Sequence, residues 1–420
     1  MPDADEKKKF FTKPLLVIFV TVMIDLIGFG IVIPVLPYYS ERPEFGATPF
    51  ILGVLVASYS VMQFFFSPIL GSLSDRVGRR PVLFFSLLGT AAGFLLVGFA
   101  GSLWMLFAGR ILDGITGGNI STAQAYIADV TTRKNRARGM GLIGAAFGIG
   151  FVLGPMLGGV LSRWGAHVPF IFAGALALAN AIGVFSYLPE SLPKEKRVAH
   201  SSGSNRFVHL FHSLAEPRFR WLTIIYFLVV TAFSIMTTAF VLYTQERFGY
   251  DAEQNGWLFG YIGIIAVLMQ GGIFGRLAHA VGEAALLAAG SFILAASLFM
   301  VPYVGPQWGG LVGLLIGMAF FAVGNSLANP AASSLASKVA REHEQGKALG
   351  IMQSGASLAR AVGPFIAGVF LNTAAGVVND HSLAVTFWTA AGIMFVAFVG
   401  ALLFARNAPL HHQTHEAAEA

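Results

Sequence analysis

The segment that organises this chain reads GSLSDRVGRRP and covers residues 71–81. It carries Arg76, Arg79 and Arg80 and separates the apolar runs 50–70 and 82–100. Each run can cross a bilayer as a helix, which takes about 20 residues. Short loops rich in Lys and Arg stay on the cytoplasmic side of a membrane. The segment therefore predicts a hairpin of two membrane helices whose tip is cytoplasmic.

The composition indicates a membrane protein throughout. Of the 420 residues, 55% are hydrophobic and 11% are charged, whereas soluble domains carry about 25% charged residues. The chain has no cysteine, which excludes disulfides, thiolate catalysis and cysteine-bound metals. We expect no enzyme activity and no metal or other cofactor. We also expect no nucleic-acid partner, because the net charge of +6 is explained by Lys and Arg in the loops.

Apolar segments recur twelve times and predict twelve membrane spans. The first is too long for a signal peptide and contains Asp25, so we interpret it as a span. The predicted spans are 14–38, 49–70, 82–100, 103–129, 139–162, 169–188, 221–243, 255–274, 284–302, 309–336, 347–371 and 383–405.

The basic residues fix the predicted orientation. All but five of the 27 Lys and Arg residues fall in segments that are cytoplasmic if both termini are cytoplasmic. The five exceptions are Arg42, Arg163 and Arg247 in external loops, and Arg110 and Arg360 within spans. We expect a cytoplasmic N-terminus at 1–13, a six-helix bundle at 14–188, a linker at 189–220, a second six-helix bundle at 221–405 and a cytoplasmic tail at 406–420.

The two halves resemble each other. Segment 141–155 matches 350–364 in the spacing of its glycines and proline, and 118–119 matches 324–325. An offset of about 200 residues indicates a duplicated six-helix unit, with a substrate site between the halves near the midplane. The counterpart of segment 71–81 is degenerate, because His279 and Ala280 replace its Asp-Arg pair.

Four motifs, in order, resemble a known family. Segment 71–81 resembles the G-x-L-x-D-R-x-G-R-R signature of the major facilitator superfamily. Segment 148–159 (GIGFVLGPMLGG) looks like the glycine-proline signature of its drug:proton antiporters. Segment 25–37 (DLIGFGIVIPVLP) is similar to the first helix of the tetracycline-efflux group, and 110–114 (RILDG) to the fourth-helix arginine signature.

This resemblance covers all twelve spans and implies an all-α membrane protein with twelve transmembrane helices in two six-helix bundles. It implies a secondary transporter of the bacterial inner (plasma) membrane that works by alternating access. We expect proton-coupled export of an amphipathic or hydrophobic small molecule by a monomer. The alternatives are transport of a metabolite, sugar or lipid by the same superfamily, coupled or facilitative, and a non-transporting sensor or channel.

The resemblance implies that the first loop is a cytoplasmic gate that latches one state of the transport cycle. Its residues are Gly71, Asp75, Arg76, Gly78, Arg79 and Arg80. A carboxylate and glycines are not needed for charge bias alone, which favours a latch over a simple topology anchor.

A second group of residues is predicted to serve helix packing and bending: Gly150, Gly154, Pro155, Gly158, Gly159, Gly363 and Pro364. Gly150, Gly154 and Gly158 recur every four residues and share one helical face. We interpret this face as a close-packed contact between the halves; ordinary small-residue packing is the alternative.

Charged residues within spans give the sharpest functional signal, because an ionised side chain costs several kcal/mol there. Asp25, Arg110 and Asp113 are predicted to take part in proton coupling, with Asp25 as the exchanging carboxyl and Arg110 modulating it. Arg110 and Asp113 are three residues apart, so a purely structural ion pair is equally open. Arg360 is predicted either to bind an anionic group or to pack against backbone carbonyls.

Polar residues with apolar neighbours are predicted to line the substrate cavity: Tyr59, Gln63, Asn119, Gln124, Asn325, Asn329, Gln353 and Arg360. Hydrogen bonding between helices is the alternative for each. The sequence also departs from the tetracycline exporters, which carry a histidine in the eighth helix and an acidic residue in the ninth. Ala266 and Leu294 stand at those places, so the proton relay of that group is absent from the second half.

Overall fold

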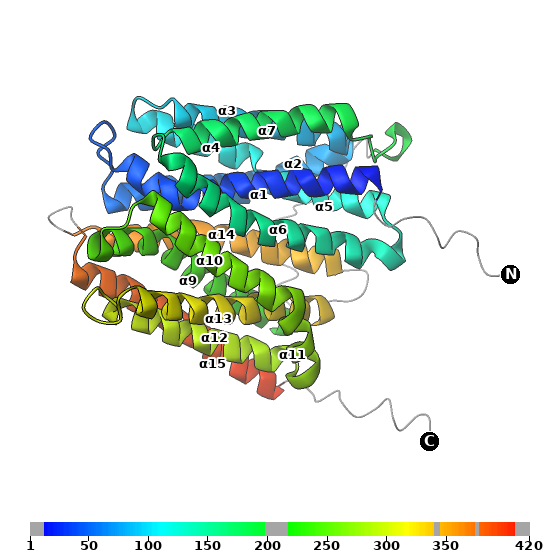
Figure 1. Ribbon diagram of the computed structural model, residues 1–420. Helices are drawn as coiled ribbons and strands as arrows, with labels where there is room; N and C mark the ends of the chain where they lie inside the picture. Colours follow the sequence, from blue (N-terminus) through cyan, green and yellow to red (C-terminus); the bar gives the residue numbers. More distant parts are fainter. Residues whose placement is uncertain (1–11, 198–216, 340–344, 374–377, 408–420) are drawn as a thin grey trace, which may run out of the picture.

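The computed structural model describes residues 12–197, 217–339, 345–373 and 378–407. These residues form long helices joined by short turns (Figure 1). The predicted terminal segments lie mostly outside the described residues, and so does the centre of the predicted linker.

The first half of the chain forms one group of helices, in the upper part of Figure 1. Its elements are α1 (Lys13–Ser40), α2 (Pro49–Val77), α3 (Arg79–Gly98), α4 (Leu103–Thr116), α5 (Asn119–Val130), α6 (Arg133–Ser162), α7 (Val168–Tyr187) and the short η1 (Lys194–Lys196).

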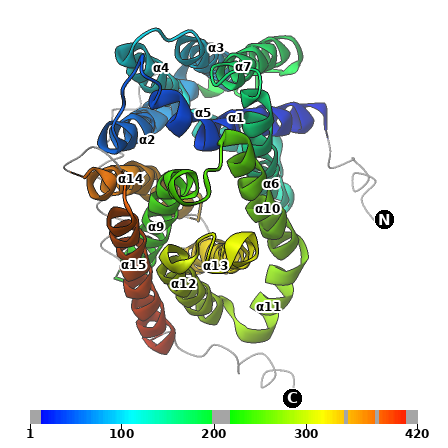
Figure 2. The same ribbon diagram turned by 60° about the vertical axis from the view of Figure 1, so that its left-hand side comes forward.

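The second half forms the other group, which lies below the first in Figures 1 and 2. Its elements are α9 (Pro217–Phe248), α10 (Ala252–Leu268), η2 (Met269–Ile273), α11 (Phe274–Val281), α12 (Glu283–Met300), η3 (Val301–Tyr303), α13 (Gly310–Val339), α14 (Gln345–Leu371) and α15 (Asp380–Asn407). Here η2 is a π-helical turn that joins α10 and α11 into one span, 252–281.

The prediction of an all-α membrane fold is confirmed. Among the described residues, eleven helices are long and apolar enough to cross a membrane. The one remaining predicted span is the fourth, 103–129. It is not a single helix, because it is broken at Gly117 and Gly118 into α4 and α5. Glycines weaken a helix interior, and here the break makes room for the side chain of Tyr59, whose hydroxyl lies 2.8 Å from a Cβ built on Gly117.

Segment 71–81 is mostly helical, so its prediction as a loop was wrong. Helix α2 continues to Val77 and α3 starts at Arg79, which leaves Gly78 as the connection. Gly78 has a φ of +109°, which side-chain-bearing residues rarely adopt, and a Cβ there would meet the carboxylate of Glu190. One glycine therefore reverses the chain between two spans.

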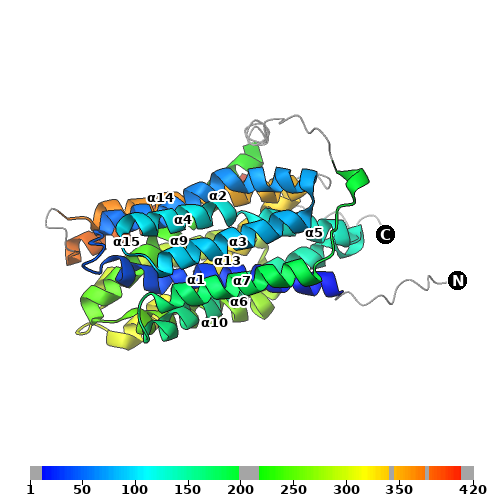
Figure 3. The ribbon, with the colours of Figure 1, turned by 90° about the horizontal axis from the view of Figure 1, so that it is seen from above.

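We call the membrane face at which α1 begins and α15 ends the terminal face, and the other one the opposite face. With an even number of spans, both helix ends lie on one side of the molecule (Figure 3). Helix caps begin two of the spans that start at the opposite face. The Thr48 hydroxyl accepts from the Ile51 amide to begin α2, and Asp251 and Gln254 form a capping box on α10.

The two halves touch near the opposite face through glycines. Helix α6 meets α10 where Gly159 lies against Gly256, and a Cβ on Gly256 would come within 2.6 Å of the Pro155 carbonyl oxygen. Helix α2 meets α14 where Gly53 lies against Gly368, with 3.1 Å between the Gly53 Cα and a Cβ built on Gly368. Small residues thus let the backbones of the halves approach closely.

The same helices separate toward the terminal face. A Cβ built on Gly141, Gly144, Gly271 or Gly350 would have no atom within 4 Å apart from its chain neighbours and the nearby backbone of its own helix. Gly141 and Gly144 lie on α6, Gly271 in the π-helical turn and Gly350 on α14, all past the contacts described above. We interpret these contacts as a molecule that is closed between the halves at the opposite face and open toward the terminal face.

The glycine face of α6 has a different partner from the one predicted. Gly150, Gly154 and Gly158 lie against Leu26, Gly30 and Ile31 of α1, within the first half. The neighbouring position Gly159 faces the second half instead, against Ala252, Glu253 and Gly256 of α10. On α14, Gly363 likewise packs inside its own half against α9, at Thr231, Ser234 and Ile235, whereas the Pro364 carbonyl faces Gly53 of the other half.

Replacing Gly256 by Ala should open the opposite face. The new methyl group overlaps backbone atoms of α6, which cannot rotate away, at a cost of about 1–3 kcal/mol in this conformation. Because the chain is free of cysteine, Trp164→Cys and Trp308→Cys can carry spin labels on the two halves, and their distance distribution should gain a longer component. Gly271→Ala is the matched control, since it adds the same group in open space. Equal distributions for the two variants would contradict this account of the closure.

Candidate functional site

A polar cluster lies inside the first half, where α1, α2 and the broken fourth span meet. Arg110 of α4 donates from Nη1 to Oδ2 of Asp113 over 3.0 Å, and both side chains are almost fully buried. The Arg110 guanidinium also lies over the ring of Tyr59 from α2, 4.4 Å from its centroid. Cation–π contact and ion pairing together compensate a charge that is held away from water.

The break between α4 and α5 supplies the polar groups that complete this cluster. Asn119, at the start of α5, donates from Nδ2 to Oδ1 of Asp25 over 3.1 Å. Gln63 donates to the carbonyl of Gly117 and to the Tyr59 hydroxyl, at 3.0 Å each. Carbonyls at a helix end have no partner inside the helix, so the break creates an acceptor in mid-span.

Asp25 and Asp113 differ in their surroundings. Asp113 is paired with Arg110, whereas the hydrogen bond that the structure gives to the Asp25 carboxylate comes from a neutral amide. Asp25 is half-buried, and no ion pair of Asp25 occurs among the described residues. The structure therefore contains one compensated and one uncompensated carboxyl group at this depth.

The second half contributes Arg360 from α14. Its side chain is half-buried and donates from Nη2 to the Ser357 hydroxyl over 3.1 Å. It lies in electrostatic range of Tyr59 from the first half and of Tyr226 from α9. Tyr59 also lies in electrostatic range of Asp25, Asp113 and Arg110. This phenol therefore interacts with all four charged groups.

Among the described residues, the side chains of the remaining predicted cavity residues make no hydrogen bond to this cluster. Gln124 is half-buried on α5, Asn325 and Asn329 on α13, and Gln353 on α14, two turns from Arg360. The Asn325 side-chain oxygen is buried without a hydrogen-bond partner among the described residues. The structure thus joins Tyr59, Gln63 and Asn119 to the charged residues and leaves the other four residues separate.

A row of aromatic rings, whose phenylalanines were not predicted as site residues, connects the halves. Phe29 lies 5.9 Å from Tyr59 and 6.0 Å from Phe151, measured between ring centroids. Phe151 lies 6.1 Å from Phe233 of α9, which stacks on Phe321 at 5.8 Å. Tyr59 was predicted to line the cavity, and Phe29 and Phe151 lie within quoted motifs, but Phe233 and Phe321 carried no signal among 38 phenylalanines.

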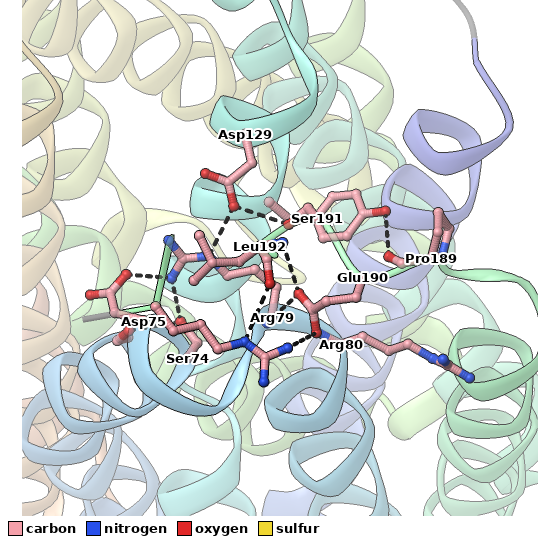
Figure 4. Close-up of polar contacts among 12 residues, drawn as sticks. Ser74, Asp75, Arg79, Arg80, Asp129, Pro189, Glu190, Ser191 and Leu192 are labelled. Atoms are coloured by element: carbon pink, nitrogen blue, oxygen red, sulfur yellow. Dashed lines mark hydrogen bonds and ion pairs between the residues drawn. The ribbon is translucent and has the colours of Figure 1, made fainter. Parts of the chain in front are cut away.

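Segment 71–81 takes part in a second polar cluster, at the terminal face (Figure 4). Arg79 is nearly buried and bonds Asp75 at 2.6 Å, Asp129 at 3.1 Å and the Ser74 hydroxyl at 2.6 Å. The backbone N–H of Arg79 donates to Glu190 over 2.8 Å. Asp75 is therefore held by an ion pair with Arg79 across Gly78.

This cluster ties together parts of the first half only. Arg79 links α2, α3 and the end of α5, and Glu190 adds the segment after α7 (Figure 4). Arg80 donates to the Phe185 carbonyl of α7, and Gly71 provides the carbonyl that accepts from Ser74. Arg76 is exposed. A latch between the halves stays a prediction, since these contacts are all internal to one half.

A third set of contacts closes the opposite face. The Tyr38 hydroxyl of α1 donates to the Tyr250 carbonyl over 2.7 Å and accepts from Asn255 of α10 over 2.9 Å. Gln245 donates to Glu41 over 3.0 Å, and Arg163 pairs with Glu253. Each of these contacts joins the two halves.

All three arginines predicted to be external are paired on this face. Besides Arg163, Arg42 lies 3.5 Å from Glu44, and Arg247 pairs with Asp380 at 2.9 Å.

Burial raises the pKa of Glu41, and the hydrogen bond from Gln245 partly opposes that rise. Because the closed face buries Glu41, we expect its closure to be coupled to proton binding there.

Two similar halves of membrane-spanning helices, in contact at one face and holding charged groups at mid-depth, are typical of a membrane transporter. The model of the Major Facilitator Superfamily matches residues 18–328 and 273–420. The chain belongs to the Major Facilitator Superfamily.

Among known relatives, the chain is 33% identical over 402 residues to the class H tetracycline resistance protein of Pasteurella multocida, covering 94% of each chain. It is 32% identical to the class B protein of Escherichia coli over 84% of this chain and 87% of the relative. Multidrug resistance protein 2 of Bacillus subtilis is 29% identical over 88% of this chain and 90% of its own.

Solved structures agree with this fold. The crystal structure of the human organic anion transporter MFSD10 (TETRAN) has a TM-score of 0.69 at 26% identity, covering 93% of this chain and 99% of its own. The nucleoside transporter NupG has a TM-score of 0.76 at 13% identity and covers 94% of this chain and all of its own, which shows the shared fold alone.

Arg79→Ala should destabilise the first half by about 2 kcal/mol, because it leaves the carboxylates of Asp75 and Asp129 without their common cation. The measurement is thermal unfolding of purified protein in detergent. Arg276→Ala is the control, since Arg276 occupies the equivalent segment of the second half and is exposed. A loss of stability as large in Arg276→Ala would refute the buried role of Arg79.

The opposite face should close more readily as the pH falls. The closed state raises the pKa of Glu41, so it binds a proton more tightly than a state in which Glu41 is hydrated. Acidification through that raised pKa should shift the distance between labels at positions 164 and 308 toward the shorter component. Glu41→Gln should remove this pH dependence, and Glu246→Gln, an exposed neighbour, should retain it. A shift that survives Glu41→Gln would assign it to other groups.

Proposed function

We propose that this protein is a proton-coupled exporter of amphipathic or hydrophobic small molecules that works by alternating access. The observation that carries the proposal is the uncompensated carboxyl group of Asp25. It lies within α1, accepts a hydrogen bond from Asn119 at the helix break, and has a half-buried side chain. A carboxyl group in that position can accept and release a proton.

Arg110 and Asp113 have a supporting role in this proposal. Their ion pair is buried and internally neutral, so it fixes the position of Tyr59 and shapes the field around Asp25. Exchange of a proton at Asp113 would leave the buried Arg110 charge unpaired, which is costly. We therefore assign the transported proton to Asp25.

The relatives support export as the direction and a drug-like molecule as the cargo. Several of them are described as tetracycline or multidrug resistance proteins, and one solved relative as an organic anion transporter. Transport of a metabolite, sugar or lipid is not favoured by these similarities. The row from Tyr59 through Phe29 and Phe151 to Phe233 offers apolar surface for an aromatic or aliphatic body.

The proposal includes an orientation and a division of labour. We assign the terminal face to the cytoplasm of a bacterial inner membrane, which makes the described conformation open to the inside. Two bundles, 14–188 and 221–405, would rock about the site while the linker 189–220 joins them. The cluster around Arg79 would then serve as the cytoplasmic gate element of the first bundle, in a protein that acts as a monomer.

Asp25→Asn should abolish proton-driven transport and leave substrate binding in place. Tetracycline and the compounds that thermally stabilise the purified protein would be tested for uptake into inside-out proteoliposomes under an imposed pH gradient. We expect at least about a tenfold loss of gradient-driven uptake in the variant, because the amide carries no exchangeable charge. Downhill flux should persist.

Asp380→Asn is the matched control, because it neutralises an exposed carboxylate at the opposite face, far from the cluster along the chain. It should transport like the unmodified protein. Full proton-driven transport by Asp25→Asn would refute Asp25 as the carrier, and flux that ignores the pH gradient in the unmodified protein would refute coupling.

A further inference from the structure

Arg360 lies at the midpoint of its span. The apolar part of α14 runs from Gly350 to Leu371, 22 residues, and Arg360 is the eleventh of them. A permanently charged guanidinium at this depth costs several kcal/mol unless something compensates it. Its partners therefore indicate what the position is for.

The protein itself leaves Arg360 uncompensated. Its recorded hydrogen bond goes to the Ser357 hydroxyl, which in turn donates to the Gln353 carbonyl of the same helix. No acidic side chain forms an ion pair with it among the described residues. Two roles were predicted for Arg360, binding an anionic group or packing against backbone carbonyls. Among the described residues, Arg360 donates no hydrogen bond to a backbone carbonyl.

Arg110 provides the contrast within the same molecule. It is fully buried, paired with Asp113 and covered by the ring of Tyr59, and its Nε is buried without a partner. Arg360 is half-buried, and none of its nitrogen atoms is among the buried unpartnered atoms of the described residues. Its remaining N–H groups are therefore accessible, and Ser357 holds the guanidinium in place.

The surroundings of Arg360 fit an anion attached to an apolar body. The phenols of Tyr59 and Tyr226 lie in electrostatic range of it, one from each half of the molecule. Tyr59 also begins the aromatic row through Phe29 and Phe151. A planar guanidinium matches a carboxylate or sulfonate with two parallel hydrogen bonds.

We propose that Arg360 is the recognition site for an acidic group on the transported molecule, so that the substrates are amphipathic organic anions. The carboxylate or sulfonate binds Arg360 between the two phenols, and the apolar body lies against the aromatic row. The proposal rests on the proposed transport function and deepens it by naming the substrate class.

The test measures binding of matched probes to the purified full-length protein by isothermal titration. The acids are naphthalene-2-acetate and naphthalene-2-sulfonate; naphthalene-2-acetamide is the neutral counterpart and naphthalen-2-ylmethylammonium the cationic one. We expect the acids to bind about 10- to 100-fold more tightly, the range of a charge-assisted hydrogen bond. Arg360→Gln should remove this preference, and Arg360→Lys should retain part of it.

Controls keep the result interpretable. Arg276→Gln, an exposed arginine of α11, should preserve the preference for acids. Thermal unfolding without ligand shows that Arg360→Gln is folded; if it is not, the acid-to-amide ratio of Arg360→Lys decides. Equal or weaker binding of the acids, no binding of either acid, or a preference that survives Arg360→Gln would overturn the proposal.

The same samples separate this inference from proton-coupled export. A pH indicator in weak buffer reports whether acid binding releases or takes up protons. Tight, Arg360-dependent binding with proton uptake would keep the anion site and contradict exchange of substrate for protons. Proton release on binding of the amide or the amine alone would keep the coupling and overturn the anion site.

Discussion

The structure depends on the cost of holding charge inside a membrane. Four charged residues lie within spans, and their charges are compensated to different degrees: Asp25, Arg110, Asp113 and Arg360. Arg110 and Asp113 neutralise each other, Asp25 is held by an amide, and Arg360 is held by a hydroxyl. Uncompensated charges within a membrane usually mark functional sites, which is why we propose Asp25 and Arg360 as the functional centre.

Two backbone features make this arrangement possible. The break at Gly117 and Gly118 brings Asn119 to Asp25 and exposes a carbonyl for Gln63. Close glycine contacts at the opposite face allow the halves to meet there while the terminal face stays open. In the proposed mechanism the site is reached from one side in this conformation, as alternating access requires.

Much of the fold could be predicted because hydrophobic length and basic loops report membrane spans directly. The charged residues were found for the same reason: Asp25 and Arg360 stand out against apolar neighbours.

The break in span 103–129 was missed, since two glycines in a membrane helix are common and only the packing of Tyr59 shows their use. The partner of the α6 glycine face was also misjudged, because a small-residue face does not say which helix it meets. The aromatic row was invisible among 38 phenylalanines, as facing lipid and facing the site look alike in sequence.

The central claim is that Asp25 changes its protonation state when a substrate binds. Infrared difference spectroscopy of the purified protein, with and without a bound compound, reports this directly through the carboxylic acid C=O stretch. The account predicts a difference band in the unmodified protein that is absent from Asp25→Asn and present in Asp380→Asn. A substrate-induced carboxyl band that persists unchanged in Asp25→Asn would contradict it.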